Sequence, residues 1–212
     1  MTLRATAGRE VALDRLGPGR TVVYVYPLSG RPGVALPEGW DAIPGARGCT
    51  AEACGFRDHH RELAEAGAAA VYGLSAQDTE YQRELVERLH LPFEMLSDER
   101  LRLADALGLR TFETGGMRLY RRRTMVIRDG AIEHVFFPVD APGEHAEEVL
   151  TWLRRRTSGT DGEAPRRRRL RSSSSTASTS SMPSVRSRCR RWRGPAGPPS
   201  TWGSWPALRS GP

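Results

Sequence analysis

Hydrophobic runs and helical patterns alternate along the first 156 residues of the chain. Residues 21–26 (Thr-Val-Val-Tyr-Val-Tyr) predict a central strand buried on both faces, because β-branched and aromatic residues follow one another without a polar break. The other expected elements are a hairpin over 3–13, strands over 69–75 and 93–96, helices over 49–66, 78–90 and 99–107, a hairpin over 122–139 and a last helix over 144–155. This order predicts an α/β fold whose central mixed sheet, with parallel crossovers in its first half, carries helices on both faces.

Polar residues mark where two of the helices should begin. Asp78 or Thr79 is the expected N-cap of the second helix. Ser97 and Asp98 are expected to cap the third helix, over residues 99–107. Residues 109–119, which follow this helix, show no clear period and are expected to be irregular.

The composition suits one domain of ordinary size. Of the 212 residues, 38% are hydrophobic and 27% are charged. No hydrophobic run approaches the length of a membrane span, and residues 1–4 (Met-Thr-Leu-Arg) lack the apolar core of a signal peptide. The few cysteines suit a reducing compartment better than a disulfide framework, so a cytoplasmic protein is expected.

Basic charge is concentrated at the C-terminal end of the chain. From Thr157 onward there are eleven arginines and two acidic residues, which give a charge of about +9. Because the whole chain has a net charge of +7, residues 1–156 carry about −2. The runs of arginine (166–169) and serine (172–175) leave no hydrophobic periodicity. Residues 157–212 are therefore expected to be a disordered basic low-complexity tail after a folded domain over 1–156.

This tail has two interpretations. Clustered arginines attract phosphates, which would make the tail a nucleic-acid-binding arm. However, a mixture of Arg, Ser, Pro, Gly and Trp is also typical of GC-rich DNA translated out of frame, and the chain has neither lysine nor asparagine. The second interpretation is favoured, so nucleic acid is not expected as a partner and Cys189 is expected to be incidental.

The candidate chemistry begins at Cys49. The glycines and the proline of residues 44–48 predict a turn, and the helical pattern begins at about Thr50, so Cys49 lies at a helix N-terminus. Unpaired backbone N–H groups and the helix dipole favour a thiolate at this position. The thiolate is the nucleophilic form of cysteine, and this placement is one way to lower a thiol pKa.

A second cysteine lies five residues further along the same predicted helix. In an ideal helix the Cα atoms of Cys49 and Cys54 would be about 8.6 Å apart. A disulfide requires less than about 7 Å. These two cysteines can therefore bond only if at least the first turn of the helix opens.

This pair has two other interpretations. Cys49 and Cys54 could be ordinary small buried residues, or they could form a metal site with His59 and His60. The C-x4-C spacing beside a histidine pair is not a usual zinc spacing, so solvated histidines are favoured over metal ligands.

Residues 48–58 (Gly-Cys-Thr-x-Glu-x-Cys-x-Phe-Arg-Asp) resemble the active-site helix of the peroxiredoxins, in particular the bacterioferritin-comigratory or Q-type subclass. The resemblance extends from about residue 2 to residue 155. It implies a thioredoxin-like fold, which agrees with the predicted order of elements. It also implies that Cys49 attacks a peroxide and that Cys54 resolves the product.

The resemblance adds an arginine to the candidate site. Residues 125–127 (Met-Val-Ile) align with the family's apolar late strand, which places Arg122 at the position of the catalytic arginine. Arg121 and Arg123 are expected on the opposite face of the strand. Glu52, one turn into the helix, is interpreted as a helix cap rather than as a group that tunes the site.

The chain departs from the family at two positions before Cys49. Ala46 and Ala42 stand where the family has a threonine or serine and a proline. An insertion over residues 28–48 is the expected cause, with Pro27 in the proline's place. Ser29 or Thr50 would then supply the missing hydroxyl.

The resemblance implies a complete redox cycle without a cofactor or a metal. Cys49 would form a sulfenic acid and then a disulfide with Cys54, which a thioredoxin-like dithiol would reduce. The expected partners are a peroxide and this reductant, with no membrane, and the protein is expected to be a monomer or a homodimer.

Two rival functions remain. A thiol–disulfide oxidoreductase of the same fold would normally carry C-x-x-C, so the C-x4-C spacing argues against it. A non-catalytic redoxin-like binding protein would use the basic arm, and removal of residues 157–212 would abolish its function. A peroxidase would instead lose its function on substitution of Cys49.

Overall fold

The computed structural model describes residues 1–158 of the chain, and the expectations for the tail lie outside these residues. Its strands are β1 (Thr2–Ala5), β2 (Glu10–Ala12), β3 (Arg20–Val25), β4 (Ala68–Ser75), β5 (Met95–Ser97), β6 (Thr111–Thr114), β7 (Met117–Tyr120), β8 (Arg123–Arg128) and β9 (Ala131–Phe136). Its helices are the 3-10 turn η1 (Trp40–Ala42) and α1 (Cys49–Asp58), α2 (His60–Glu65), α3 (Thr79–Leu89), α4 (Arg102–Leu107) and α5 (His145–Ser158). None of these helices is both long enough and apolar enough to cross a membrane.

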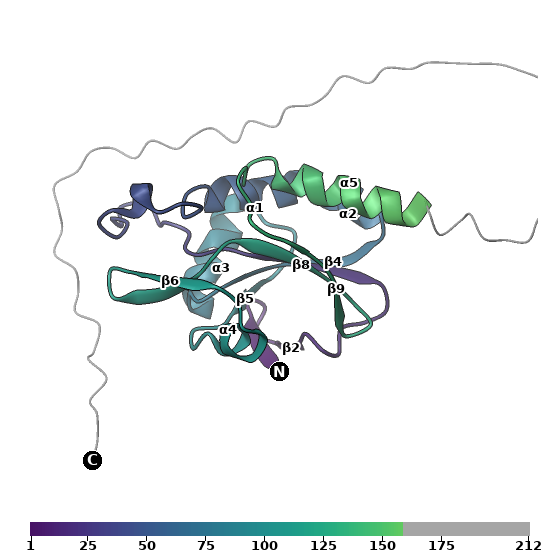
Figure 1. Cartoon of the computed structure of the whole chain (residues 1–212), viewed down its shortest axis with the longest axis horizontal. Helices are drawn as coiled ribbons and strands as arrows, with labels where there is room; N and C mark the ends of the chain where they lie inside the picture. The colour runs from purple at the N-terminus through teal and green to yellow at the C-terminus, as the bar shows by residue number, and fades with distance from the viewer. Residues whose placement is uncertain (159–212) are drawn as a thin grey trace, which may run out of the picture.

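Seven strands form one mixed sheet at the centre of the molecule (Figure 1). Their order is β2-β1-β5-β4-β3-β8-β9. The central strand β3 pairs in parallel with β4 and antiparallel with β8, and β4 pairs in parallel with β5. The expected parallel crossovers and the closing antiparallel hairpin are thus both present.

Side chains of β3 alternate between two hydrophobic layers, one on each face of the sheet. Val22 and Tyr24 face the layer that includes residues of α1, α2, α3 and α5. Val23 and Val25 face the layer that includes residues of α4. Figure 1 shows α1, α2 and α5 together on one side of the sheet and α4 on the other. This two-sided burial explains the unbroken apolar run of β3 and confirms the predicted fold class.

The ring of Phe56 anchors α1 to the sheet. It stacks on Tyr24 with the ring centroids 4.5 Å apart and the planes 8° from parallel, and both side chains are fully buried. Burial of one such side chain contributes about 1.5–3 kcal/mol to stability. This contact fixes the helix that begins with Cys49 over the middle of the sheet.

The helix expected over residues 49–66 is interrupted. His59 leaves the helical conformation (φ −96°, ψ 7°), so α1 ends at Asp58 and α2 begins at His60. Phe56 and Leu63, on either side of the break, are both fully buried. The hydrophobic pattern continues through the break and therefore gave no sign of it.

Residues 109–119, expected to be irregular, instead contain most of the hairpin β6–β7. Thr111 pairs with Tyr120 and Thr114 with Met117. Gly115 and Gly116 form the turn with φ of 54° and 73°, the left-handed values that a tight two-residue hairpin turn requires. The glycine pair was a hairpin signal between two short strands.

Helix α4 begins three residues later than expected. Leu101 has a left-handed backbone (φ 52°), which delays the helix to Arg102. The Asp98 carboxylate still accepts hydrogen bonds from the backbone N–H groups of Arg102 (3.0 Å) and Leu103 (2.8 Å). The capping role predicted for Asp98 is therefore confirmed, although the boundary was wrong. Asp78 likewise caps α3, by accepting from Tyr81 N at 2.6 Å.

Candidate active site

Cys49 is the first residue of α1 and is almost completely buried. Cys49 is 6% exposed, and its thiol forms no disulfide. The thiol donates a hydrogen bond to the backbone oxygen of Ala46 at 3.5 Å. Gly48 is the N-cap, with φ 94° and no side-chain cap. A Cβ at Gly48 would lie 2.9 Å from the Pro142 ring, so a glycine is needed here for space as well as for conformation. The predicted position of Cys49 at a helix N-terminus is confirmed.

Arg122 lies immediately before β8 and reaches the Cys49 sulfur. Its Nη2 is 3.1 Å from Cys49 Sγ and 2.9 Å from the backbone oxygen of Arg47. Its Nε donates to the backbone oxygen of Gly45 at 3.3 Å. The residue is 3% exposed. One guanidinium therefore connects the start of β8 with the turn before α1.

The neighbouring arginines of Arg122 have other surroundings. The guanidinium of Arg121 lies 5.7 Å from the centroid of the Phe112 ring. Arg123 donates to the backbone oxygens of Arg110 (2.8 Å) and Arg121 (3.2 Å). Neither bonds Cys49, whose sulfur is hydrogen-bonded within residues 1–158 to Ala46 and Arg122, in agreement with the alternation of side chains along a strand.

Glu52 belongs to the site, and its interpretation as a helix cap is wrong. It is fully buried, and its Oε2 forms an ion pair with Arg122 Nη1. Its other oxygen, Oε1, has no hydrogen-bond partner among the described residues. Glu52 is three residues after Cys49, so both side chains lie on the same helix face. That spacing was the available signal, but burial of the carboxylate could not be seen in the sequence.

The charges of the site act on the Cys49 thiol in opposite directions. Burial raises the pKa of Cys49 most strongly. The positive charge of Arg122 and a backbone hydrogen bond from Leu28 lower this pKa, whereas the negative charge of Glu52 raises it. The net direction is upward, so the low thiol pKa predicted from the helix N-terminus alone is wrong.

Glu52 is also affected by burial. Loss of solvation raises its pKa from 4.5 to about 7, although Arg122 acts in the opposite direction. Arg122, faced by two acidic groups, has its own pKa raised, chiefly by the Cys49 and Glu52 charges acting against burial. The site thus places one permanent cation between two groups that ionise with difficulty.

Cys54 lies on the same unbroken helix as Cys49. It is 2% exposed, and the two cysteines occupy the first and sixth positions of α1. The geometric condition deduced from their spacing therefore applies here: a bond between them requires unwinding of α1.

The hydroxyl expected near Cys49 is not at either proposed position in an available form. Thr50 is exposed, whereas Ser29 is 1% exposed and its Oγ donates to Gln77 Oε1 at 3.0 Å. Ala46 is 1% exposed and contributes its backbone oxygen to the thiol. The chain after Pro27 does reach the site, since Leu28 packs against the cluster that contains Ala46, whose backbone oxygen accepts from the Cys49 thiol.

The histidines near Cys54 have protein partners. His59 Nδ1 lies 2.5 Å from Glu62 Oε2, and the ring of His60 lies 5.8 Å from that of Phe93. Within residues 1–158 no three His, Cys, Asp or Glu side chains are grouped in a way that could hold a metal ion.

The sequence did not point to His145, which lies at the start of α5. It is 1% exposed, and its Nε2 lies 2.8 Å from Thr124 Oγ1. Burial lowers its pKa, whereas the neighbouring carboxylate of Glu148, 2.9 Å from its Nδ1, acts in the opposite direction. Its ring centroid lies 6.0 Å from that of Phe56, so His145 belongs to the core on which α1 packs.

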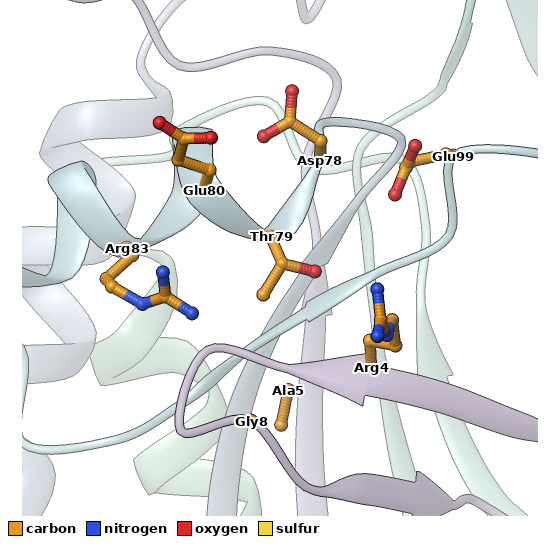
Figure 2. Close-up of a pocket in the computed structure, with 8 residues that line it drawn as sticks. All are labelled: Arg4, Ala5, Gly8, Asp78, Thr79, Glu80, Arg83 and Glu99. Atoms are coloured by element: carbon orange, nitrogen blue, oxygen red, sulfur yellow. The ribbon is translucent and has the colours of Figure 1, made fainter.

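The pocket drawn in Figure 2 lies at the start of α3 and contains none of the site residues. Arg4 and Arg83 line it together with Asp78, Glu80 and Glu99. These mixed charges indicate no single class of ligand.

Comparison with known proteins places the chain in a family. The AhpC/TSA family profile matches residues 42–135. Chloroplastic peroxiredoxin Q of Oryza sativa subsp. japonica is 31% identical over 153 residues, which are 72% of this chain and 62% of that protein. Peroxiredoxin Bcp of Escherichia coli K12 is 30% identical over 155 residues, which are 69% of this chain and 86% of that protein.

The solved structures agree with this placement. Peroxidoxin BcpB from Mycobacterium tuberculosis matches with a TM-score of 0.58 and 26% identity, over 73% of this chain and 92% of that one. Peroxiredoxin Q of Xanthomonas campestris, at 20% identity and a TM-score of 0.57, shares the fold. With its cysteines at positions 49 and 54, the chain belongs to the peroxiredoxin family and is similar to the Q and Bcp proteins within it.

Proposed function

We propose that this protein is a thiol-dependent peroxidase that reduces hydrogen peroxide or alkyl hydroperoxides at Cys49. One observation carries the proposal: the Arg122 guanidinium lies 3.1 Å from the sulfur of a buried cysteine at a helix N-terminus. A peroxidatic cysteine needs positive charge next to both the thiolate and the oxygen that leaves. The names of the relatives, peroxiredoxin Q and peroxiredoxin Bcp, support the same reaction.

The first step is attack of the Cys49 thiolate on the near oxygen of ROOH. An S–O bond forms and the O–O bond breaks, so the sulfur becomes a sulfenic acid and RO⁻ leaves. The leaving oxygen takes a proton and departs as ROH. The thiol proton must be removed before attack, and Arg122 stabilises the anion in either position because it remains charged throughout.

In the second step Cys54 resolves the sulfenic acid. The Cys54 sulfur attacks the Cys49 sulfur, the S–O bond breaks and water leaves, which gives an intramolecular disulfide. Because both cysteines lie on α1, its first turns must unwind for this bond to form. Unwinding would also separate Glu52 from Arg122. The second step therefore disrupts the arrangement of residues that is needed for the first step.

A dithiol then reduces the disulfide. Two thiols of a thioredoxin-type protein are oxidised to a disulfide while Cys49 and Cys54 return to thiols, so one peroxide is consumed for each dithiol. A reducing, cytoplasmic environment would maintain this cycle, and no cofactor is required by its balance.

The test is peroxide consumption by the purified full chain with a thioredoxin system. Cys49→Ser should abolish turnover. Cys54→Ser should stop turnover with thioredoxin but retain it with a small thiol, because a small thiol can reduce the sulfenic acid directly. Absence of turnover in the parent protein, with Cys49 reduced and open to alkylation, would contradict the proposal and favour a non-catalytic redoxin-like protein.

A further inference from the structure

Six polar side chains are buried together beside the active site, where β3, β4 and β5 end. They are Tyr26, Ser29, Ser75, Gln77, Gln82 and Ser97, each at most 7% exposed. β3, β4 and β5 are parallel neighbours, so these side chains lie at the same edge of the sheet. Buried polar groups are costly unless they are hydrogen-bonded, and the hydrogen bonds of this network converge on Gln77.

Gln77 forms the centre of the network by pairing with the backbone of Ser29. Its Oε1 accepts from Ser29 N at 3.0 Å, and its Nε2 donates to Ser29 O at 3.0 Å. The Ser29 hydroxyl donates to the same Oε1, also at 3.0 Å. The Gln77 side-chain amide thus hydrogen-bonds both the backbone N–H and the backbone C=O of Ser29, as the backbone of a neighbouring strand would.

The Gln77 backbone is itself fixed from three sides. Its N–H donates to Ser75 Oγ at 3.1 Å. Its carbonyl oxygen accepts from Gln82 Nε2 and from Ser97 Oγ, each at 2.7 Å. Gln77 is therefore fixed by residues at the ends of β4 and β5 and in α3, and its side chain hydrogen-bonds the segment just after β3.

The residue that Gln77 holds adjoins the one that contacts the cysteine. Leu28 lies directly before Ser29, and a backbone hydrogen bond from Leu28 acts to lower the pKa of the Cys49 thiol. The Leu28 side chain packs against the cluster of Trp40, Ala46 and Leu119. Ala46 in turn receives the hydrogen bond of the Cys49 thiol. The backbone and the side chain of Leu28 are thus both held near the Cys49 sulfur.

We propose that Gln77 is a positioning residue for the reaction of Cys49: by fixing Ser29, it holds the Leu28 backbone N–H against the sulfur. This inference rests on the peroxidase function proposed above. Hydrogen-bond donors stabilise developing charge only if they are fixed before the reaction. Among residues 1–158 no side-chain hydroxyl bonds the sulfur, since Ala46 has none and that of Ser29 is bonded to Gln77, so a backbone donor carries more weight.

The test compares Gln77→Met with Gln82→Met in the full chain with Cys54→Ser and Cys189→Ser. Both substitutions remove a buried amide of similar size, but only Gln77 contacts Ser29. Gln77→Met should raise the Cys49 pKa, read from the pH profile of iodoacetamide alkylation, by about one unit, and should slow the reaction with hydrogen peroxide at pH 7 about tenfold. Gln82→Met removes one of the supports of the Gln77 backbone but leaves the Gln77 amide paired with Ser29, so it should change both quantities much less than Gln77→Met, even if it lowers the Tm by as much.

Two further variants keep the test decisive. If Gln77→Met does not fold, Gln77→Asn must show the same rise, because its shorter side chain cannot pair with both backbone groups of Ser29. Ser29→Ala, which keeps those groups, should leave the alkylation profile unchanged. An unchanged Cys49 pKa in a folded Gln77 variant, or an equal rise in Gln82→Met, would overturn the proposal. The alkylation profile needs no peroxidase activity, so it tests Gln77 even if the parent protein does not react with peroxide.

Discussion

Arg122 is the residue on which the electrostatics of the site depend. Its guanidinium faces the Cys49 sulfur and the Glu52 carboxylate, both almost or fully buried. Burial raises the pKa of each acidic group, and the single positive charge of Arg122 offsets this rise only in part. Either group therefore ionises more easily when the other is neutral.

Replacement of Arg122 by lysine should impair the reaction although the charge is kept. An ammonium cannot contact the sulfur, Glu52 and the carbonyl oxygens of residues 45 and 47 at once, as the planar guanidinium does. We expect a fall of at least about tenfold in the peroxide rate and a higher Cys49 pKa, measured by stopped flow and by alkylation. Arg121→Lys, whose side chain lies against Phe112, is the control and should react as the parent does.

Glu52→Gln should lower the pKa of Cys49. The negative charge of Glu52 raises this pKa, and glutamine removes the charge while its side-chain oxygen can still accept from Arg122. The alkylation profile of Cys49 should move to lower pH. A profile that moves to higher pH would mean that Glu52 serves mainly to orient Arg122.

At the scale of elements, the turn before α1 determines where the cysteine lies. Gly48 and Gly45 both have positive φ, of 94° and 77°. They differ in their surroundings, because a Cβ at Gly48 would meet Pro142 at 2.9 Å, whereas one at Gly45 would meet nothing within 4 Å. The pair therefore separates backbone strain from steric contact.

Gly45→Ala should cost about 1–2 kcal/mol of unfolding free energy, from the left-handed backbone alone. Gly48→Ala should cost more, and should also slow the peroxide reaction, because the N-terminus of α1 must move away from Pro142. Urea unfolding and stopped-flow rates measure the two effects. Equal costs for the two variants would show that the contact with Pro142 does not constrain the helix.

The elements with a strong hydrophobic period were predictable from the sequence. The run of β3 and the cap of α3 lie where expected, because burial on both faces and Asp capping leave clear patterns. The hairpin β6–β7 and the break at His59 were missed, because a two-stranded ribbon and a local change of backbone angles leave the apolar spacing almost unchanged.

The candidate site was predictable only in part, for a physical reason. Cys49 and Cys54 were evident from their helix, and Arg122 from the resemblance to peroxiredoxins. Glu52 and Gln77 act through burial: the first is fully buried and the second is 7% exposed. Charged and amide residues are mostly exposed in proteins, so their burial can be established only when the surrounding elements are in place.

At the scale of the whole molecule, the site is assembled from segments far apart in the sequence. The chain after β3, the start of α1 and the start of β8 meet where Arg122 contacts Cys49 and Gln77 contacts Ser29. Central strands β3, β4 and β8 hold these segments together. Protonation at the site should therefore be visible in the stability of the entire fold.

Stability should fall as pH rises through the range in which Glu52 titrates. Its pKa is about 7 in the folded protein and near the ordinary 4.5 in the unfolded chain, so between these values the folded state binds more protons. The free energy of unfolding then decreases with rising pH, by up to about 3 kcal/mol from this group. His145 acts in the opposite direction, because its lowered pKa gives stability that is lost as pH falls below about 6.5.

Comparison with Glu52→Gln isolates the carboxylate, since His145 is present in both proteins. Urea unfolding at pH 5 and at pH 8 should show that the parent loses stability relative to the variant across this interval. Well below pH 4.5 the two should follow parallel curves, because Glu52 is then protonated in both the folded and the unfolded state. A difference between parent and variant that stays constant from pH 5 to 8 would mean that Arg122 keeps Glu52 ionised throughout, with Cys49 as the group that carries the proton.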